Sequence, residues 1–333
     1  LLCRPMLVTA EIRPIILFNA YNIFGGRLVT GPGRRSSITQ VHLARRKWLL
    51  GAMTSLLFVL QGCIEIPDPY LVMGQRNWSG TVEVVRPCGT DASAPLPAAS
   101  EARVLSADGF TLVNWNMYKG SKTGWEAELD QLVRDADVVV LQEAYLNESM
   151  TEALRRSQLN WGLATAFRYR GIEAGVLTAS RANFKGICMQ RYREPMVNTP
   201  KTSLLARFRL SSGALLMVVN IHAINFTVDT DYFRETWQGL EEIVKSHDGP
   251  LIVAGDFNTW SASRQRAVES TAQRLELTPV NFTEDQRTRI MDRAVDHVYY
   301  RDLVVLEAIV LAVQASDHNA MRVTFKQAGA DAA

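Results

Sequence analysis

Asp256 and Asn258 follow an apolar run of this chain and have side chains that can bind a cation or align a water molecule. The run, residues 251–254, comes after Pro250 and ends before a glycine, which is typical of a buried strand. Side chains alternate along a strand, so residues two apart can point the same way. Open α/β sheets place ligands at the carboxyl ends of strands, where this pair lies. Taken alone, the pair fits an ordinary turn equally well.

Other predicted strands carry polar residues of the same kind at one end. In chain order these residues are Asn116, Glu143, His222 followed by Asn225, Asp296, and Asp317 with His318. Carboxylate and carboxamide oxygens are the ligands that Mg²⁺ prefers. A histidine that is paired with a carboxylate can hold or transfer a proton. This combination suits the attack of an activated water on a phosphate ester, assisted by a cation.

The residue types divide this chemistry between them. Glu143 supplies a carboxylate and Asn116 a carbonyl oxygen for a divalent cation. Asp256 and Asn258 are predicted to orient and activate the attacking water. We expect His222 to donate to a phosphate oxygen or to the leaving group.

A second histidine completes the predicted acid–base machinery. His318 is expected to pair with Asp296, which would fix its tautomer and stabilise the imidazolium form. We expect the rate to depend on neutral His318 acting as the base. His297 neighbours Asp296, but alternation turns it to the opposite face of the strand and predicts a structural role.

Several basic and amide residues are candidates for contacting the substrate phosphate. Lys119, Lys201 and Asn225 are such candidates, although lysines are usually solvated surface residues. Arg287 and Arg289 lie in a segment without an apolar pattern, which is typical of a loop. Their guanidinium groups could form a rim that recognises phosphate, and a solvated loop is the equally weighted alternative.

The composition is that of an ordinary globular protein. The chain has 333 residues, of which 47% are hydrophobic and 21% charged, and its net charge is +2. This charge does not demand a polyanionic partner. Four cysteines without a C-x-x-C spacing argue against a disulfide scaffold and against a zinc site.

The N-terminal part has the features of an exported bacterial lipoprotein. A basic cluster, a short apolar stretch and Cys63 resemble a lipoprotein signal over 41–63, in which Cys63 carries the lipid. A buried helix with an incidental cysteine is the alternative. A signal should lie at the terminus, so residues 1–40 are predicted to be non-native or disordered, with translation starting near Val41. The expected location is the cell envelope, facing the periplasm; the cytoplasm is the alternative.

The segment 64–106 is rich in proline, glycine, serine and alanine and is predicted to be a flexible tether. Export would bring Cys88 and Cys188 into an oxidising compartment, where a bridge is possible, but free cysteines are the expected state. A folded domain is predicted over 107–327, and a disordered tail over 328–333.

Hydrophobic periodicity divides this domain into strands and helices. Strands are predicted at 110–116, 138–142, 161–166, 174–179, 184–191, 203–210, 215–221, 251–255, 295–300, 303–311 and 321–326. Helices are predicted near 124–135, 148–157, 231–246 and 262–273. So many strands with few helices predict an α/β (α+β) fold of two packed mixed β-sheets with helices on the outer faces, because a doubly wound sheet would alternate more strictly.

Three motifs, “LQE” at 141–143, “GDFN” at 255–258 and “SDH” at 316–318, resemble in their order and spacing those of the endonuclease/exonuclease/phosphatase superfamily. The resemblance covers about residues 109–326 and implies the four-layered α/β sandwich of deoxyribonuclease I. The segments “NWNMYKG”, “VVLQEA”, “VVNIHAINF” and “SDHN” are most similar to the bacterial YafD-like proteins, a group without a settled substrate. The resemblance also implies that Asp317 joins the ligands of Mg²⁺, or of Mn²⁺ in its place.

One departure from the superfamily pattern bears on the substrate. Repair-type relatives carry an acidic or amide residue two places after the first asparagine, where this chain has Tyr118. They also use a mid-chain tyrosine near the phosphate, where this chain relies on His222. Both differences favour a site of the deoxyribonuclease or sphingomyelinase style over abasic-site repair.

The resemblance implies a monomeric, metal-dependent phosphodiesterase of the nuclease type that acts on nucleic acid. One alternative is a phospholipid phosphodiesterase of the sphingomyelinase type at a membrane surface, where a lipid anchor would hold it, or a phosphomonoesterase. A further alternative is a non-catalytic binding module on the same scaffold, against which the complete set of acid, base and ligand residues argues.

Overall fold

The computed structural model describes residues 64–74, 80–85, 87–89, 103–197, 199–227 and 230–329. All of them belong to one compact unit, Leu56–Ala333. The predicted signal with Cys63, residues 1–40 and most of the predicted tail lie outside the described residues. Within the described ranges, no helix is long and apolar enough to cross a membrane.

The first sheet has nine strands and carries the first two predicted site residues. Its order is β16-β17-β4-β5-β7-β6-β2-β3, and β1 also pairs with β6. The strands are β1 (Ile64–Glu65), β2 (Leu71–Gly74), β3 (Thr81–Val84), β4 (Phe110–Asn116), β5 (Val138–Tyr145), β6 (Asn160–Tyr169), β7 (Ile172–Ser180), β16 (Leu303–Leu311) and β17 (Ala320–Gln327). Because β4 and β5 are parallel while β4–β17 and β5–β7 are antiparallel, the sheet is mixed, as predicted.

The second sheet has six strands in the order β12-β15-β11-β10-β9-β8. The strands are β8 (Phe184–Tyr192), β9 (Lys201–Arg209), β10 (Leu215–His222), β11 (Leu251–Asp256), β12 (Thr278–Pro279) and β15 (Asp296–Arg301). The register places His222 beside Asp256, and Asp256 beside Asp296. Three predicted site residues therefore stand side by side on neighbouring strands.

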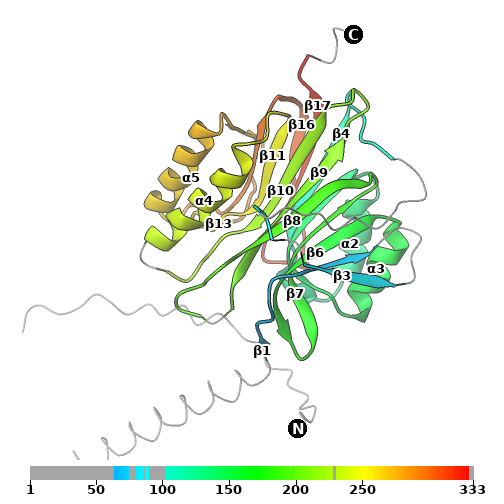
Figure 1. The fold of residues 1–333 in the computed structure, drawn as a ribbon, viewed down its shortest axis with the longest axis vertical. Helices are drawn as coiled ribbons and strands as arrows, with labels where there is room; N and C mark the ends of the chain where they lie inside the picture. Colours follow the sequence, from blue (N-terminus) through cyan, green and yellow to red (C-terminus); the bar gives the residue numbers. More distant parts are fainter. Residues whose placement is uncertain are drawn as a thin grey trace, which may run out of the picture. The chain divides into compact units, whose positions relative to one another are not determined.

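Helices cover the outer face of each sheet (Figure 1). α2 (Trp125–Val133) and α3 (Glu148–Ser157) pack on the first sheet, and α4 (Asp231–Val244) and α5 (Ala262–Arg274) pack on the second. A short 3₁₀ turn, η1 (Tyr118–Gly120), follows β4.

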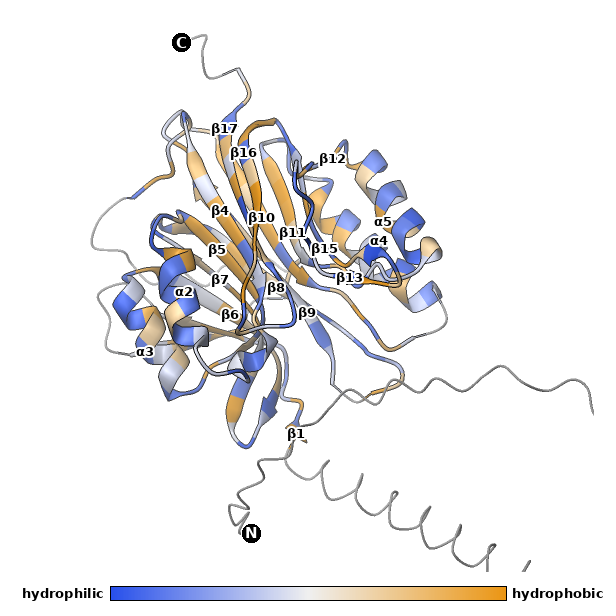
Figure 2. Ribbon diagram, turned by 180° about the vertical axis from the view of Figure 1, so that it is seen from behind, coloured by the Kyte–Doolittle hydropathy of each residue, from blue (hydrophilic) through white to orange (hydrophobic). Residues whose placement is uncertain are grey.

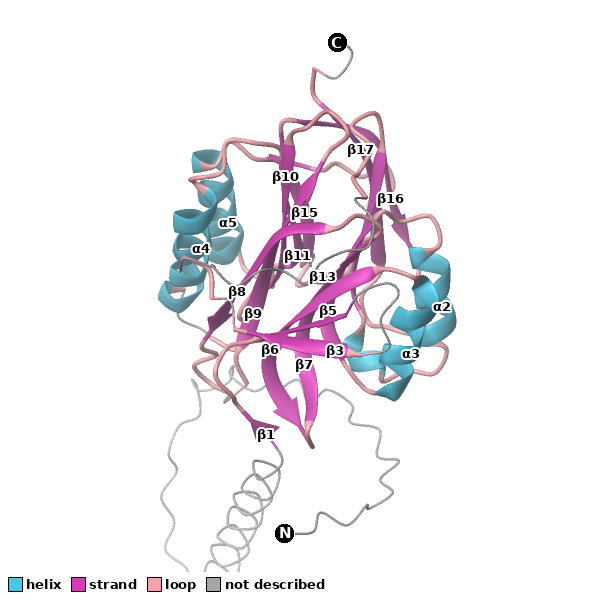
Figure 3. Ribbon diagram, turned by 45° about the vertical axis from the view of Figure 1, so that its right-hand side comes forward, coloured by secondary structure: helices cyan, strands magenta, loops and turns pink. Residues whose placement is uncertain are grey.

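The helices pack because each has one apolar face. In α4 the buried residues Phe233, Trp237, Leu240 and Val244 recur every three or four positions. Figure 2 shows predominantly hydrophobic central strands, whereas α3 and α5 alternate between hydrophobic and hydrophilic positions. Figure 3 shows the resulting layers, with α4 and α5 on one side of the sheets and α2 and α3 on the other. This is the four-layered sandwich that was predicted.

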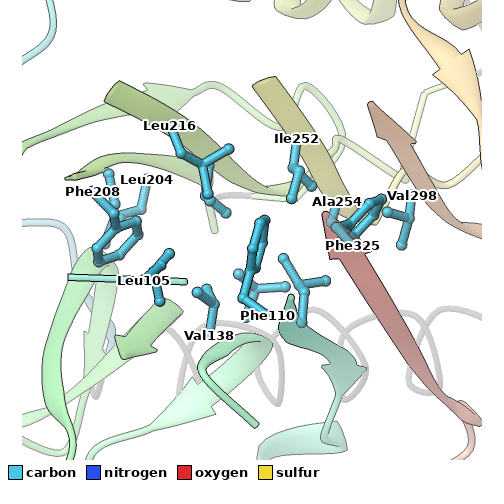
Figure 4. Packing of buried hydrophobic residues seen from close by; sticks show 14 of the residues in the cluster. Leu105, Phe110, Val138, Leu204, Phe208, Leu216, Ile252, Ala254, Val298 and Phe325 are labelled. Atoms are coloured by element: carbon cyan, nitrogen blue, oxygen red, sulfur yellow. The ribbon is translucent and has the colours of Figure 1, made fainter. Parts of the chain in front are cut away.

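The central strands bury side chains on both faces, which explains their nearly continuous apolar sequence. In β10, Leu216 and Val218 pack between the two sheets, while Met217 and Val219 pack against the helices. Figure 4 shows the layer between the sheets, where Phe110 of β4 faces residues of the second sheet. Each fully buried apolar side chain of this size stabilises the fold by about 1.5–3 kcal/mol.

The prediction of a flexible tether over 64–106 is wrong for the described part of that segment. β2 is buried and pairs with β6 on one side and β3 on the other. Leu105 is also buried and forms a bridge with Leu210. The domain therefore begins before residue 107. The four-residue run of β2 is too short for its periodicity to stand out from a proline- and glycine-rich background.

The cysteines that were expected to be free form a disulfide, Cys88–Cys188. Cys88 N donates to Met189 O at 3.0 Å, and Pro87 forms a bridge with Met189. The crosslink thus fastens the segment around Cys88 to β8, an edge strand of the second sheet. Its sequence separation is 100 residues. A loop of that length, once closed, stabilises a fold by about 4.7 kcal/mol in the chain-entropy model.

Candidate active site

Residues of both sheets meet at the carboxyl ends of β4, β10 and β11. Asn116 Nδ2 donates to Asp256 Oδ2 across the two sheets at 3.0 Å. His222 Nε2 lies 3.5 Å from the same oxygen. Asp256 is therefore the point at which the predicted site residues of the first and second sheets converge.

The backbone around Asp256 takes conformations that need particular residues. A Cβ atom at Gly255, where φ is 151°, would lie 1.9 Å from Ile221 O, so a side chain is excluded there. Asn258 lies beyond the strand with φ 51°, and its Nδ2 donates to Ala223 O at 2.9 Å. Asn258 therefore braces the loop after β10 instead of lying parallel to Asp256 by strand alternation.

Asp256 has the electrostatic environment of a general base. Burial raises its pKa to about 6, against the opposing effect of the His318 charge. Asn258 N donates to Asp256 Oδ1 at 3.0 Å and orients the carboxylate. A carboxyl group with this pKa is mostly ionised at pH 7 and basic enough to accept a proton from an attacking water.

His318 and Asp296 form the predicted pair, with His318 Nδ1 2.7 Å from Asp296 Oδ2. Burial lowers the pKa of His318, but the carboxylates of Asp296, Asp256 and Asp317 outweigh burial and raise this pKa to about 10. A pKa raised in this way favours the imidazolium over the neutral base that the sequence predicts. An imidazolium can stabilise charge on a phosphate oxygen. Asp256, whose pKa burial raises to about 6, is then a candidate for the base.

His222 has the opposite environment. Burial, reinforced by the positive charge of Lys201, lowers the pKa of His222 well below its ordinary value. Lys201 Nζ lies 2.9 Å from His222 Nε2, and an ammonium can only donate in such a contact. The ring is then neutral with its proton on Nδ1. The structure thus places Lys201 in the site, against His222.

Glu143 reaches the site from an irregular part of β5. The pairing of β5 with β7 shifts register at this point, and Glu143 has φ 52°. Such a bulge re-aims a side chain. Glu143 Oε2 contacts Lys119 Nζ, and Oε1 lies 4.0 Å from His222 Nε2. Burial acts to raise the pKa of Glu143, but Lys119 and Lys201 outweigh burial and lower this pKa.

The oxygen donors of the first sheet suit a hard divalent cation. The Lys119 ammonium already contacts Glu143, so this carboxylate accepts a cation in the observed geometry. Asn116 adds a carbonyl oxygen, Oδ1, which accepts from Tyr118 N at 3.2 Å. Glu143 and Asn116 therefore fit the ligand roles that the sequence predicts for them.

A second group of donors lies in the second sheet and the loop before β17. The ligand atoms of Asp256, Asp296 and His318 all lie within 4.8 Å of one another and could hold a metal ion. Asp296 Oδ1 is buried and has no hydrogen-bond partner among the described residues. The neighbouring carboxylates raise the pKa of His318, so a metal ion bound there would have to displace a proton from the ring. Glu143 and Asn116 offer oxygen donors only, which suit a hard cation.

Asp317 lies in the loop before β17, next to Ser316, whose Oγ donates to Asn116 O at 2.6 Å. The Asp317 side chain is exposed, and its Oδ1 lies 3.4 Å from Ser316 Oγ. Its backbone oxygen accepts from Thr288 Oγ1 at 3.3 Å. In the described structure Asp317 acts on the site through its charge, which helps to raise the pKa of His318.

The predicted substrate-contacting residues have different environments. Lys119 and Lys201 lie in the site, beside Glu143 and His222 respectively. Asn225 Oδ1 instead accepts from Trp260 Nε1 at 2.9 Å. The Asn225 carboxamide is thus used to hold its own loop.

Arg287 and Arg289, for which a phosphate rim and a solvated loop were equally weighted, both bind one carboxylate in this structure. Arg287 Nε and Arg289 Nη2 each lie 2.7 Å from a carboxylate oxygen of Asp285. Hydrogen bonding from Arg287 lowers the pKa of Asp285 to about 2. The segment predicted to be a loop also contains a hairpin, β13 (Arg289–Ile290) and β14 (Arg293–Ala294). These arginines therefore order the chain before β15.

His297 has the structural role that strand alternation predicts. Its Nε2 lies 2.7 Å from Thr259 Oγ1 and 3.1 Å from Ala294 O. The ring is buried on the far side of β15 from Asp296. His297 therefore supports the loop after β11 from behind.

A buried polar network that was not predicted from the sequence lies beneath the site. Gln142 Nε2 donates to Asn114 Oδ1 at 2.9 Å and to Asn220 Oδ1 at 2.8 Å, and so connects the two sheets. Gln142 precedes Glu143, and Asn220 lies two residues before His222. The network thus ties together the two strand ends that carry these residues. A signal was present, since each amide interrupts an otherwise apolar strand.

Comparisons with known proteins identify relatives of this chain. The model of the Endonuclease/Exonuclease/phosphatase family matches residues 113–318. A UPF0294 protein of Vibrio parahaemolyticus is 36% identical over 228 residues, which are 68% of this chain and 81% of that protein. A UPF0294 protein of Yersinia pestis is 36% identical over 238 residues, which are 72% of this chain and 88% of that protein.

Solved structures share the fold at lower identity. An endonuclease/exonuclease/phosphatase from Beutenbergia cavernae superposes with a TM-score of 0.54 and 18% identity, covering 67% of this chain and 72% of that one. The catalytic domain of human Nocturnin gives a TM-score of 0.51 and 18% identity, covering 68% of this chain and 96% of that domain. At these identities the likeness shows the fold alone.

Proposed function

The chain belongs to the Endonuclease/Exonuclease/phosphatase family, whose enzymes act on phosphate esters, and on that premise we propose that it is a divalent-metal-dependent phosphodiesterase of the nuclease type. The observation that carries the proposal is the convergence on Asp256. One buried carboxylate receives Asn116 from the first sheet and lies beside His222 of the second. Hydrolysis of a phosphate ester needs a base, a cation site and stabilising positive charge. The residues around Asp256 offer groups for all three.

Asp256 is the general base of the proposed reaction. Its pKa of about 6 lets it take a proton from water while it remains ionised before the reaction. The backbone N–H of Asn258 fixes the orientation of the carboxylate. Water aligned in this way can attack the phosphorus atom in line with the leaving oxygen.

Positive charge in the site stabilises the phosphate as negative charge develops. The His318 imidazolium is held by Asp296, and the Lys201 ammonium is held against His222. Preorganised donors of this kind are a large source of rate enhancement. Glu143 and Asn116 would hold Mg²⁺, or Mn²⁺ in its place, which supplies Lewis-acid stabilisation of a phosphoryl oxygen.

The test uses the purified full chain with Mg²⁺. We expect release of p-nitrophenol from thymidine 5′-(p-nitrophenyl phosphate) and nicking of supercoiled plasmid DNA. Both activities should disappear with EDTA and in Asp256→Asn. Equal activity in Asp256→Asn would identify a contaminating nuclease, and no turnover by the wild-type chain would favour the non-catalytic binding module.

A membrane phospholipid is the second candidate substrate, because the hairpin next to the site has an apolar tip. Ile290 and Met291 of the β13–β14 hairpin are exposed. The segment leading into the hairpin also contacts the site, since Thr288 Oγ1 donates to Asp317 O. Turnover of sphingomyelin vesicles without DNA nicking would select this candidate.

We propose a location in the cell envelope on the basis of the Cys88–Cys188 disulfide. Disulfides persist in oxidising compartments such as the periplasm and are rare in the cytosol. Lipidation at Cys63 remains part of this proposal. Globomycin treatment followed by mass spectrometry of the mature N-terminus checks it, with a lipid-bearing Cys63 as the expected result and an unmodified residue as the contrary one.

A further inference from the structure

A buried arginine on α5 holds the loop that follows His222. Arg264 is 1% exposed. Its guanidinium donates to four backbone carbonyls, with Nη1 2.6 Å from Ile224 O and 3.1 Å from Asn258 O, and Nη2 2.9 Å from Asn225 O and 3.1 Å from Thr227 O. Arg264 therefore joins the loop 223–227 to the loop that carries Asn258.

Aromatic rings cover this guanidinium. Its central carbon lies 4.4 Å from the ring centroid of Trp260 and 4.6 Å from that of Phe233. Trp260 also donates to Asn225 Oδ1 of the same loop. The planar shape of arginine is used fully, because its edges bind carbonyls while its faces meet rings.

A buried carboxylate holds the same loop through its amides. Glu194 is 3% exposed. Its Oε2 accepts from Asn225 N at 2.9 Å, and its Oε1 accepts from Phe226 N at 2.8 Å. The loop 223–227 thus lies between a cation that binds its carbonyls and an anion that binds its amides.

This arrangement is a costly way to gain stability alone. Buried charges lose their hydration, and among the described residues neither Arg264 nor Glu194 forms a direct ion pair. Apolar residues of similar size would avoid that penalty. What the two charges achieve is a single backbone conformation for the loop 223–227, because they bind it from both sides.

The fixed loop carries an exposed aromatic side chain, Phe226, four residues after His222. It begins directly after His222, and Ala223 O accepts from Asn258 Nδ2. Phe226 is 52% exposed although both of its backbone neighbours are held. Its ring is therefore available to a ligand at a defined place.

We propose that Arg264 and Glu194 are positioning residues that hold the loop 223–227, and that Phe226 on this loop is a specificity-determining contact for a planar base of the substrate. The proposal rests on the phosphodiesterase function proposed above. Every nucleobase has a π face, so stacking on an exposed ring is tolerant of sequence. The substrate class is then a nucleotide-containing phosphodiester whose base, next to the scissile phosphate, is unpaired.

Amide hydrogen exchange tests the positioning part without any substrate. In Arg264→Lys and Glu194→Gln we expect the amides of Asn225 and Phe226 to exchange about tenfold faster or more, since charge-assisted hydrogen bonds are lost. Arg274→Lys is the matched control, because Arg274 lies on the same helix, has an exposed side chain and binds Glu241. The positioning role of Arg264 and Glu194 is overturned if the exchange rates of these amides are unchanged in both variants. It is also overturned if Arg274→Lys accelerates the exchange equally.

A pair of probes with one leaving group tests Phe226. Thymidine 5′-(p-nitrophenyl phosphate) carries a base, and methyl p-nitrophenyl phosphate does not. In Phe226→Ala we expect the ratio of kcat/KM between the two probes to fall about tenfold, mainly through KM of the thymidine probe. Phe226→Trp should keep the ratio, and so should the control Tyr232→Ala, which removes another exposed aromatic side chain.

The possible results separate this inference from the function on which it rests. A ratio that is unchanged in Phe226→Ala, with both probes turned over, overturns the role of Phe226 and leaves the phosphodiesterase intact. If the wild-type chain hydrolyses neither probe, the proposed function fails and the role of Phe226 fails with it. In either case the amide exchange rates test whether Arg264 and Glu194 hold the loop 223–227.

Discussion

The two sheets contribute to the site in different ways. In the second sheet, His222, Asp256 and Asp296 stand in unbroken register on three neighbouring strands, and all are buried. In the first sheet, Glu143 lies on a bulge with φ 52° and contacts Lys119, whose φ is 59°. The ladder of the second sheet fixes the groups to which we assign the acid–base chemistry. In the first sheet the irregular backbone brings the Glu143 carboxylate to the Lys119 ammonium, and we propose that a metal ion takes the place of that ammonium.

The largest expected effect is on the second sheet. Asp256→Asn removes the base, and we expect kcat at saturating Mg²⁺ to fall by about 10²–10⁴-fold. The midpoint of thermal unfolding should not fall, because the change removes a carboxylate whose ionisation burial disfavours. Excess Mg²⁺ should not restore the rate. Recovery of the rate with excess Mg²⁺ would mean that Asp256 is a cation ligand. The assignment of acid–base groups to the second sheet and cation ligands to the first would then be wrong.

A second effect comes from the His318–Asp296 pair. His318→Gln and Asp296→Asn should each lower kcat by about 10²-fold, because either change removes the imidazolium. The double variant should be little worse than either single variant, since the two residues act as one unit. Steady-state kinetics of this double-mutant cycle provides the measurement. If the fold losses in kcat of the two single variants multiply in the double variant, the two residues act independently.

A smaller effect is expected in the first sheet. Glu143→Gln keeps the shape of the side chain and removes the charge that attracts the cation. We expect a fall of about tenfold at low Mg²⁺ that higher Mg²⁺ largely reverses, because affinity and not proton transfer is lost. The measurement is the Mg²⁺ concentration for half-maximal rate. A loss that no Mg²⁺ concentration relieves would place Glu143 in the acid–base machinery instead.

The smallest effect lies at the opposite end of β11. His247 Nε2 donates to Pro250 O at 3.0 Å, and burial lowers the pKa of His247 from its ordinary value of 6.5. Below pH 6.5 the unfolded chain therefore binds more protons, and the free energy of unfolding falls as pH falls, by at most about 1.4 kcal/mol per pH unit for one histidine. His247→Gln should make this decline shallower.

Urea unfolding at several pH values below neutrality measures the effect of His247→Gln. The slope should not vanish, because burial also lowers the pKa values of His222 and His297. Activity at neutral pH should stay at the wild-type level, since His247 lies before the start of β11 and the site lies at its carboxyl end. A slope equal to that of the wild type would show that His247 does not titrate with folding.

The sequence predicts those parts of the fold that have strong local patterns. The strands around Asn116, Glu143 and Asp256 are long apolar runs, and their polar ends identify the site. β2 was not predicted because a run of four residues shows too little periodicity. The Cys88–Cys188 bridge could not be predicted for a different reason. It depends on where the segment around Cys88 meets β8, which is distant in the sequence.

Charge states and support residues in the site could not be predicted from the sequence. His318 is protonated because Asp256 and Asp317 approach it as well as Asp296, and those distances exist only in the folded chain. Arg264 looks in the sequence like any arginine on a helix. Its burial follows from the loop that closes over it.

Anomalous diffraction from crystals containing Mn²⁺ tests the division between the two sheets most directly. We predict a peak within about 2.2 Å of a Glu143 carboxylate oxygen and of Asn116 Oδ1, with the Lys119 ammonium displaced from Glu143. A single peak bound by Asp256, Asp296 and His318 would contradict the account, because it would place the cation where we place the base and the imidazolium.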